Sequence, residues 1–180
     1  MEPGFADVNT AIDLALERYQ HHPSVIGFGI DVEWFQKNAR TGGRNAIATD
    51  ELVKGWEERV KSHRRDYRIF VKHFSISNLP PTYRGDVVFV DDSQKFRNRE
   101  HFVTEFKNFA DFFYPNMVIF QIGYRADKPW WGEVETPVTR TLGQELASQT
   151  RQDCGIVWVD FTLRDVLPVD SAPEAVPPRP

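Results

Sequence analysis

Residues 25–34 are Val-Ile-Gly-Phe-Gly-Ile-Asp-Val-Glu-Trp, and this stretch, which predicts a strand, decides the fold class. Because side chains alternate along a strand, one face is expected to be apolar and the other to carry glycines and carboxylates. The apolar face has Phe28, Ile30, Val32 and Trp34, and the other has Gly27, Gly29, Asp31 and Glu33. Two glycines and two carboxylates are a poor surface for packing helices. They suit the inside of a barrel, with the carboxylates at its C-terminal mouth.

Helices and further strands alternate along the rest of the chain. Strands are predicted at 67–74, 86–91, 117–123 and 155–161. Helices are predicted at 7–20, after caps at Thr49 and Asn98, and after Thr136, with Pro137 at the first helical position. Such alternation predicts an α/β fold in which helices cover a parallel sheet. Two architectures stay open: a partial or complete (β/α) barrel of the TIM type with about five visible strands, and an open doubly wound sheet.

The length of 180 residues bears on the choice between them. A complete (β/α)8 barrel usually needs about 200 residues or more. We therefore expect a partial barrel domain at 1–167, which either self-associates as a homo-oligomer or lacks an N-terminal barrel segment. Residues 36–48 are expected to form a polar loop, and the proline-rich residues 168–180 a tail or linker.

Composition excludes several classes of protein. The chain has 22 basic and 26 acidic residues, a net charge of -4, whereas nucleic-acid binders are more often basic. No apolar run approaches the roughly 20 residues of a membrane span, so no membrane partner is expected. The single Cys154 excludes an internal disulfide and a multi-cysteine metal cluster. No P-loop or helix-opening Gly-x-Gly-x-x-Gly is present, so no cofactor is expected.

The cellular location stays open on the sequence. The first residues, Met-Glu-Pro-Gly-Phe, contain neither a basic segment nor an apolar core of a signal peptide. A mature secreted form or an excised fragment would look the same. An extracellular location therefore remains open for such a form, and a cytoplasmic one otherwise.

Polar and aromatic side chains gather near the C-terminal ends of the other predicted strands. They are Lys72, His73, Asp91, Asp92, Gln121, Tyr124, Trp158 and Asp160. In both candidate architectures ligands bind at this edge of the sheet. The sequence therefore predicts a binding or catalytic site there, although strand ends are also where chains turn polar for purely structural reasons.

Asp31 and Glu33 are the candidate catalytic pair. Residues i and i+2 of a strand lie roughly 6.6 Å apart and point the same way. Two carboxylates so close cannot both ionise freely, so the pKa of one should rise. A carboxyl that stays protonated near neutral pH can act as a general acid, as cleavage of a glycosidic bond requires.

Tryptophans support a carbohydrate ligand. Trp34, Trp130, Trp131 and Trp158 lie at predicted strand ends or in the loops after them, with Trp130 and Trp131 expected in an exposed loop. Sugar rings have apolar faces that stack on aromatic side chains, and their hydroxyls need fixed polar partners such as Lys72, Asp92 or Gln121. The alternative is that these tryptophans pack in the core or in a lid.

The segment Gly-Phe-Gly-Ile-Asp31-Val-Glu33-Trp-Phe resembles the catalytic strand of family 18 glycoside hydrolases, the chitinase-like barrels. The signature of that family is Asp-x-x-Asp-x-Asp-x-Glu. Its last Asp and its Glu fall on Asp31 and Glu33, whereas its first two aspartates fall on Ile26 and Gly29. The resemblance implies that Glu33 is the acid and that Asp31 orients the acetamido group of the substrate.

Two further strands extend the resemblance, which covers the fourth to eighth strands of a barrel. Asp92 matches the last residue of the family's Met-x-Tyr-Asp motif, and the tyrosine is absent. Trp158 matches the tryptophan that floors the sugar site on the closing strand. The chain also resembles a set of uncharacterised barrel proteins that share the runs Gly-Phe-Gly-Ile-Asp-Val-Glu-Trp, Phe-Val-Asp-Asp-Ser-Gln and Trp-Val-Asp-Phe-Thr.

Three hypotheses follow for the function. The first is a glycoside hydrolase-like protein with Glu33 as acid, Asp31 as its modulator, and Asp91 or Asp92 as base or stabiliser. The second is a carbohydrate-binding barrel module without catalysis. The third is a metal-dependent hydrolase, whose oxygen and imidazole ligands for Mg²⁺, Mn²⁺ or Zn²⁺ would be Asp31, Glu33, His73, Asp91 and Asp92.

Overall fold

The computed structural model describes residues 1–36 and 47–167 and has an α/β fold. Its strands are β1 (Gly27–Asp31), β2 (Arg68–Lys72), β3 (Val87–Asp91), β4 (Val118–Ile122) and β5 (Cys154–Trp158). Its helices are α1 (Val8–Tyr19), α2 (Asp50–His63), α3 (Arg99–Phe113), α4 (Lys128–Trp131) and α5 (Val138–Gln149). All neighbouring strands are parallel, which confirms the predicted parallel sheet with covering helices. The tail predicted at 168–180 and most of the loop predicted at 36–48 lie outside the described residues.

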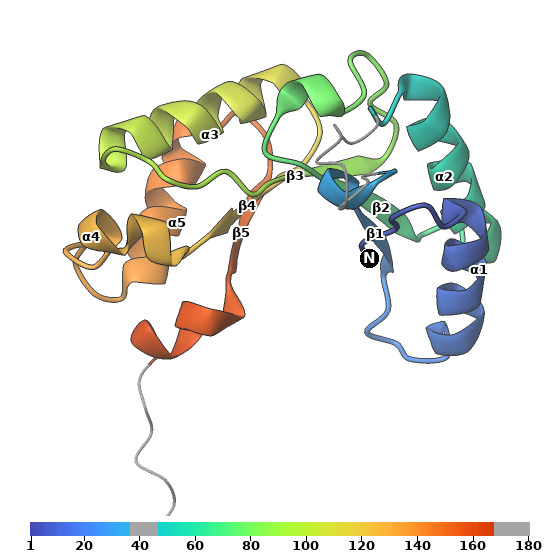
Figure 1. Cartoon of the computed structure of the whole chain (residues 1–180), viewed down its shortest axis with the longest axis horizontal. Helices are drawn as coiled ribbons and strands as arrows, with labels where there is room; N and C mark the ends of the chain where they lie inside the picture. The colour runs from blue at the N-terminus through green and yellow to red at the C-terminus, as the bar shows by residue number, and fades with distance from the viewer. Residues whose placement is uncertain (37–46, 168–180) are drawn as a thin grey trace, which may run out of the picture.

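The strand order is β1-β2-β3-β4-β5, the order of the sequence. A doubly wound sheet reverses its strand order at a switch point, and the five strands contain no reversal. The strands follow an arch, and α1, α2, α3 and α5 lie along its outer side (Figure 1). Of the two architectures that the sequence left open, the doubly wound sheet is therefore excluded for the described residues.

The helices begin where the sequence places capping residues. The side chains of Asp7, Thr49 and Asn98 accept hydrogen bonds from the backbone N–H groups three residues ahead, at 2.8, 3.3 and 2.9 Å. Such bonds satisfy N–H groups that lack a partner within the helix. The apolar stripes that follow pack against the outer face of the sheet, where α3 contributes four fully buried phenylalanines: Phe102, Phe106, Phe109 and Phe113. No helix within residues 1–36 and 47–167 has the length and apolar character that crossing a membrane requires.

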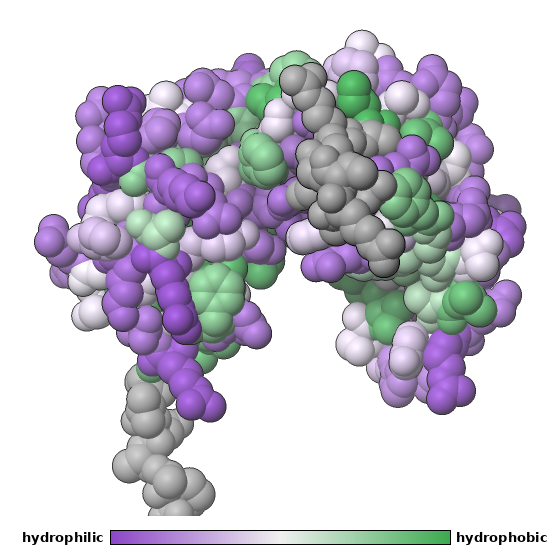
Figure 2. Space-filling view, viewed as in Figure 1, coloured by the Kyte–Doolittle hydropathy of each residue, from purple (hydrophilic) through white to green (hydrophobic). Residues whose placement is uncertain are grey.

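The inner face of the sheet is apolar and only partly covered. Phe70 of β2 and Val157 of β5 are 38% and 46% exposed there. The face contains two hollows, of about 540 and 460 Å³, and Phe70 and Ile119 line both. Figure 2 shows the hollow between the two limbs of the arch. Helices thus bury one face of the sheet and leave the other accessible.

The first residues of the chain lie along the outer edge of β1. The Met1 ammonium donates to the Gly29 carbonyl at 2.9 Å, and the Asp31 N–H donates to the Met1 carbonyl at 2.8 Å. Gly4 then forms a parallel bridge with Phe35. This edge is therefore partly paired, whereas β5 ends the sheet on the other side within the described residues.

The strand predicted at 25–34 is shorter than the sequence pattern suggests. It ends at Asp31, and Val32–Trp34 form a turn of 3₁₀ helix. The Asp31 carboxylate accepts a hydrogen bond from the Glu33 N–H at 3.1 Å, which closes this turn. The prediction that Glu33 shares the strand face of Gly27, Gly29 and Asp31 is therefore wrong, because the alternation of side chains stops at Asp31.

The structure differs from three other predictions about secondary structure. The strand predicted at 155–161 ends at Trp158 and a 3₁₀ segment, Asp160–Asp165, follows. The last helix begins at Val138, because Pro137 has an extended backbone and occupies the N-cap position. The loop predicted around Trp130 and Trp131 is the short helix α4.

Candidate functional site

Lys72 connects three neighbouring strands at the C-terminal edge of the sheet. It ends β2 and is paired in register with Asp31, the last residue of β1. Its Nζ lies 2.9 Å from Oδ2 of Asp31 and forms an ion pair and hydrogen bond with Oδ2 of Asp92, which directly follows β3. All three side chains are mostly buried. The parallel sheet thus brings together one cation and two carboxylates that the sequence places at the ends of three strands.

The charges of this cluster are coupled. Burial lowers the pKa of Lys72, but the Asp92 and Asp31 carboxylates outweigh this effect and raise it overall, so the ammonium keeps its charge. Burial raises the pKa of Asp92; Lys72 opposes this effect, and the negative charges of Asp31 and Glu33 add to it, so the pKa is raised overall. The carboxyl group with the raised pKa in this cluster is therefore Asp92, which lies outside the Asp31–Glu33 pair of the sequence argument.

Gln121 and Tyr124 extend the polar edge on the side of β4. The Gln121 amide donates a hydrogen bond to the Tyr124 hydroxyl. Burial, and next the charge of Asp92, raise the pKa of Tyr124 to about 12, so it remains a neutral phenol. Gln121 lines the hollow of about 540 Å³ together with Asp31 and Lys72, above an apolar floor formed by Phe70, Val90, Ile119 and Val157. This hollow can hold a ligand that has both polar groups and an apolar surface.

Glu33 lies in a second cavity beside this hollow. The cavity has a volume of about 270 Å³, and Asp92 lines it as well. Glu33 is half-buried in the 3₁₀ turn after β1. Although Glu33 and Asp31 do not share a strand face, Glu33 and Asp92 thus border one cavity, and Lys72 ties Asp92 to Asp31.

Asp91 and His73 are placed differently from Asp92 and Lys72. Asp91 is 0% exposed, and its Oδ1 accepts a hydrogen bond from the Ser93 N–H at 2.8 Å. Its Oδ2 is buried without a hydrogen-bond partner in the described structure, and burial raises its pKa to about 8. His73 is 1% exposed, and its Nδ1 accepts a hydrogen bond from the Ser75 N–H at 2.7 Å. Neither side chain lines the two cavities at this edge.

The ligand set of the metal-dependent hydrolase does not assemble. Within residues 1–36 and 47–167, no group of three or more His, Cys, Asp and Glu side chains is arranged to hold a metal ion. The Lys72 ammonium lies between Asp31 and Asp92, where a cation would have to bind. The prediction that Asp31, Glu33, His73, Asp91 and Asp92 form one ligand set is therefore wrong for the described structure.

Trp131 and Trp158 pack against each other. Their ring centroids are 5.2 Å apart in an edge-to-face arrangement. The Trp131 Nε1 donates to the Tyr124 carbonyl and the Trp158 Nε1 to the Thr162 hydroxyl, each at 2.9 Å. Trp131 is only 3% exposed, so its prediction as part of an exposed loop is wrong. The packing alternative, which the sequence also allowed, describes Trp131.

Two other predicted residues stand apart from the Lys72 cluster. Asp160 is exposed at the start of the last 3₁₀ segment, and it lines neither of the two cavities at this edge. Trp34 ends the turn that contains Glu33 and is 37% exposed. The structure therefore places Trp34 next in sequence to a cavity residue, whereas it leaves Asp160 outside both cavities.

Four residues of the Glu33 cavity were not predicted: Phe74, Ser93, Gln94 and Lys95. Ser93, Gln94 and Lys95 come shortly after the predicted strand 86–91, and this position among polar strand-end residues was the available signal. Phe74 is the last residue of the predicted strand 67–74 and had no such signal. The buried Asp127 fixes the segment that follows β3, because its carboxylate accepts hydrogen bonds from the N–H groups of Lys95 and Phe96 at 3.1 and 2.7 Å. A loop held in this way can present side chains to the cavity in a fixed position.

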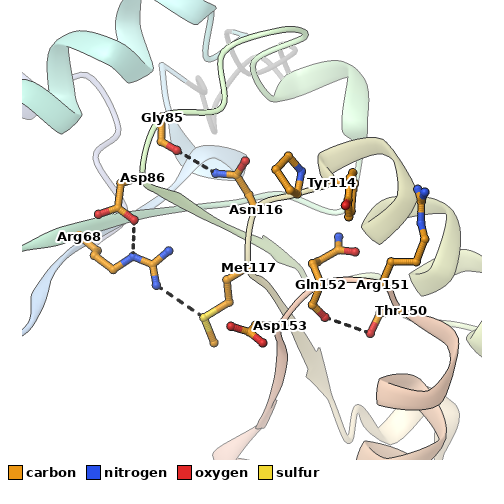
Figure 3. Close-up of a pocket in the computed structure, with 11 residues that line it drawn as sticks. Arg68, Gly85, Asp86, Tyr114, Asn116, Met117, Thr150, Arg151, Gln152 and Asp153 are labelled. Carbon is orange, nitrogen blue, oxygen red and sulfur yellow. Dashed lines mark hydrogen bonds and ion pairs between the residues drawn. The ribbon is translucent and has the colours of Figure 1, made fainter.

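A larger cavity lies at the opposite end of the strands. It has a volume of about 610 Å³ and includes Arg68, Asp86, Asn116, Met117 and Arg151 (Figure 3). Three of its charged groups are already paired: the Arg68 Nε lies 2.9 Å from Asp86 Oδ1, and an Arg151 Nη lies 3.3 Å from Asp111. Because ligands of parallel sheets bind at the C-terminal ends of strands, the smaller cavities around Lys72 and Glu33 are the better candidate site.

The candidate site thus consists of a lysine between two carboxylates, a third carboxylate across a small cavity, and an amide–phenol pair beside an apolar hollow. It combines hydrogen-bond donors and acceptors with apolar side chains that are partly exposed. Comparison of the chain with protein-family models, with curated proteins and with solved structures finds no match.

Proposed function

We propose that the protein is a glycoside hydrolase-like (β/α) barrel protein that binds and cleaves an oligosaccharide or polysaccharide, with Glu33 as general acid. One observation carries the proposal: Glu33 and Asp92 line one cavity, and Lys72 ties Asp92 to Asp31 at the C-terminal ends of three consecutive parallel strands. Paired carboxyl groups around a cavity are what hydrolysis of a glycosidic bond requires.

Each carboxyl group has a separate role in this proposal. Glu33 donates a proton to the glycosidic oxygen as the bond to the sugar breaks. Asp92, whose pKa burial raises, accepts a proton from the water molecule whose oxygen bonds to the sugar carbon, or as a carboxylate stabilises the positive charge that develops on the sugar. Asp31, held by Lys72, orients the polar substituents of the substrate. Gln121 and Tyr124 supply further hydrogen bonds to hydroxyl groups.

The proposed barrel would be incomplete in this chain. Sequential strand order and helices on the outer side of the arch support a barrel segment. The apolar inner face supports closure of the barrel, because the interior of a barrel is filled by such side chains. We propose that further strands close it, either from a second copy of the chain or from a segment N-terminal to this one.

A binding module without catalysis is the second candidate. It is favoured by Lys72, which neutralises negative charge between the two aspartates and makes the cluster a balanced hydrogen-bonding surface. Ile26 and Gly29, which stand where the resembled signature has aspartates, favour it as well. Such a module would bind sugar and leave the glycosidic bond intact.

The experiment is a hydrolysis and thermal-shift screen with N-acetylated and plain oligosaccharides, with and without EDTA. It compares wild type, Glu33→Gln, and Glu133→Gln as a control at an exposed position. Loss of turnover by about 10²-fold or more in Glu33→Gln alone, unaffected by EDTA, supports the hydrolase. Stabilisation by sugar without turnover supports the binding module. The absence of both turnover and stabilisation by any sugar contradicts both candidates.

A further inference from the structure

Phe74 is an exposed aromatic residue at the cavity that Glu33 and Asp92 line. It follows the buried His73 just beyond the end of β2 and is 49% exposed. The Phe74 side chain is therefore available to a ligand that enters the cavity beside the two carboxyl groups. The strand pattern of residues 67–74 gave no indication of this position.

The backbone around Phe74 is anchored on both sides. The His73 N–H donates to the Val90 carbonyl of β3 at 3.0 Å, and the Ser93 hydroxyl donates to the Phe74 carbonyl at 3.3 Å. The ring also packs on the buried His73 ring, with centroids 4.5 Å apart. Phe74 is therefore held by the residue that follows Asp92, so the ring and the carboxyl group belong to one rigid arrangement.

The cavity at Phe74 combines the two kinds of surface that a sugar ring presents. A pyranose has a flat face of C–H groups and a rim of hydroxyl groups. Phe74 offers an aromatic surface, and Glu33, Asp92 and Ser93 offer polar atoms around the same cavity. Its volume of about 270 Å³ lies just below that of sites for drug-sized ligands, which suits a single sugar ring.

We propose that Phe74 is the stacking platform of the site and determines its preference for a pyranose ring over an acyclic polyol. This inference rests on the proposed carbohydrate function. It assigns to Phe74 the sugar-stacking role that the resemblance to family 18 glycoside hydrolases implies for Trp158. The Trp158 ring packs against Trp131 and lies over Gly123, where even a Cβ atom would approach the indole to 2.3 Å. Phe74, by contrast, borders the cavity of the proposed acid.

The test is isothermal titration with N-acetylated and plain tetrasaccharides, with sorbitol as the acyclic comparison. It uses wild type, Phe74→Ala, Phe74→Tyr, and Phe112→Ala as a control, since Phe112 is a similarly exposed phenylalanine of α3. Phe74→Ala is expected to weaken sugar affinity roughly tenfold, the upper range for an aromatic contact, while Phe74→Tyr and Phe112→Ala remain close to wild type. In NMR spectra of the sugar, the ring-proton signals should shift upfield with wild type, Phe74→Tyr and Phe112→Ala, but not with Phe74→Ala.

The role of Phe74 and the carbohydrate function can be disproved separately. Unchanged affinity in Phe74→Ala, together with weaker binding in Asp92→Asn, would overturn the role of Phe74 and leave the carbohydrate site in place. Equal affinity of wild type for sorbitol and the sugars would also overturn it. If wild type bound no sugar, the proposed function would fail and the platform with it. Equal melting temperatures of the variants show that folding does not account for the result.

Discussion

The Nζ of Lys72 lies 2.9 Å from Oδ2 of Asp31 on the neighbouring strand, and the same nitrogen is paired with Asp92 at the end of the next one. The Asp92 and Asp31 carboxylates on either side of Lys72 outweigh the effect of burial and raise the pKa of its ammonium. Because every strand runs in the same direction, the three side chains meet at one edge. The candidate site therefore depends on an ion pair network that is also part of the fold.

Removal of the Lys72 ammonium should destabilise the protein. Lys72→Met leaves the buried Asp92 carboxyl group without its partner in the ion pair, and breaking a buried pair costs about 3–5 kcal/mol. Urea unfolding at pH 7 should show this loss. Lys54→Met, at an exposed position of α2, should change the free energy of unfolding by less than about 0.5 kcal/mol. Equal stability of both variants would show that the Lys72 network is not formed.

Replacement of Asp91 should stabilise the protein in a pH-dependent manner. Burial raises the pKa of Asp91 from 3.8 to about 8 in the folded state. Between these values the unfolded state releases the proton and the folded state keeps it, so stability falls as pH rises. Asp91→Asn removes this penalty, and its amide oxygen can still accept the bond from Ser93. Each pKa unit corresponds to about 1.4 kcal/mol, so a gain of the order of a few kcal/mol is expected at pH 8.

Urea midpoints of wild type and Asp91→Asn, measured from pH 4 to pH 9, test this prediction. The difference should be small at pH 4 and greatest at and above pH 8. Asp153→Asn, at an exposed position, serves as the control and should follow wild type throughout. A difference between Asp91→Asn and wild type that stayed constant with pH would mean that Asp91 does not carry a raised pKa.

Trp131 should contribute to stability rather than to ligand binding. Its buried ring packs on Trp158, and Trp131→Ala is expected to cost about 3–5 kcal/mol, as for other buried aromatics. Differential scanning calorimetry measures the loss, and titration with the sugar that wild type binds should give an affinity close to wild type at a temperature where the variant is folded. If Trp131→Ala kept normal stability but no longer bound sugar, Trp131 would be a ligand-binding residue and this prediction would be wrong.

The exposed inner face should promote association. Val157 lies on this face at the edge strand β5, and Val157→Lys places a charge there. Sedimentation velocity should show concentration-dependent association of wild type, weakened in Val157→Lys and unchanged in Leu14→Lys, which alters an exposed position of α1 on the outer side. A wild type that is monomeric at all concentrations, with β5 amides protected from hydrogen exchange, would contradict this expectation.

The amino-acid sequence was sufficient to predict those helices and strands that have local sequence signals. Alternating apolar segments indicated the parallel sheet, and Thr49 and Asn98 marked helix starts because their side chains cap N–H groups. The end of the first strand at Asp31 could not be predicted in the same way. There the aspartate side chain captures the Glu33 N–H, and such a bond competes with strand pairing without altering the hydrophobic pattern.

Tertiary contacts account for the other differences at the site. Lys72, Asp31 and Asp92 were all expected at one edge, but only the strand order shows that Lys72 lies between the two carboxylates. Trp131 appeared exposed because its sequence neighbours are Lys128, Pro129 and Gly132, whereas packing against Trp158 buries it. Such contacts join segments that are distant in the sequence, and no local pattern records them.

The most direct measurement is an amide chemical-shift map of the ¹⁵N-labelled protein titrated with an N-acetylated tetrasaccharide and, in parallel, with a plain one. We expect at least one of the two sugars to shift amide signals in the segments around the two cavities of the C-terminal edge. These segments are Asp31–Trp34, Lys72–Ser75, Asp92–Lys95 and Gln121–Tyr124. Shifts clustered instead around Arg68, Asn116 and Arg151, at the opposite end of the strands, would contradict this expectation, as would a map that neither sugar changes.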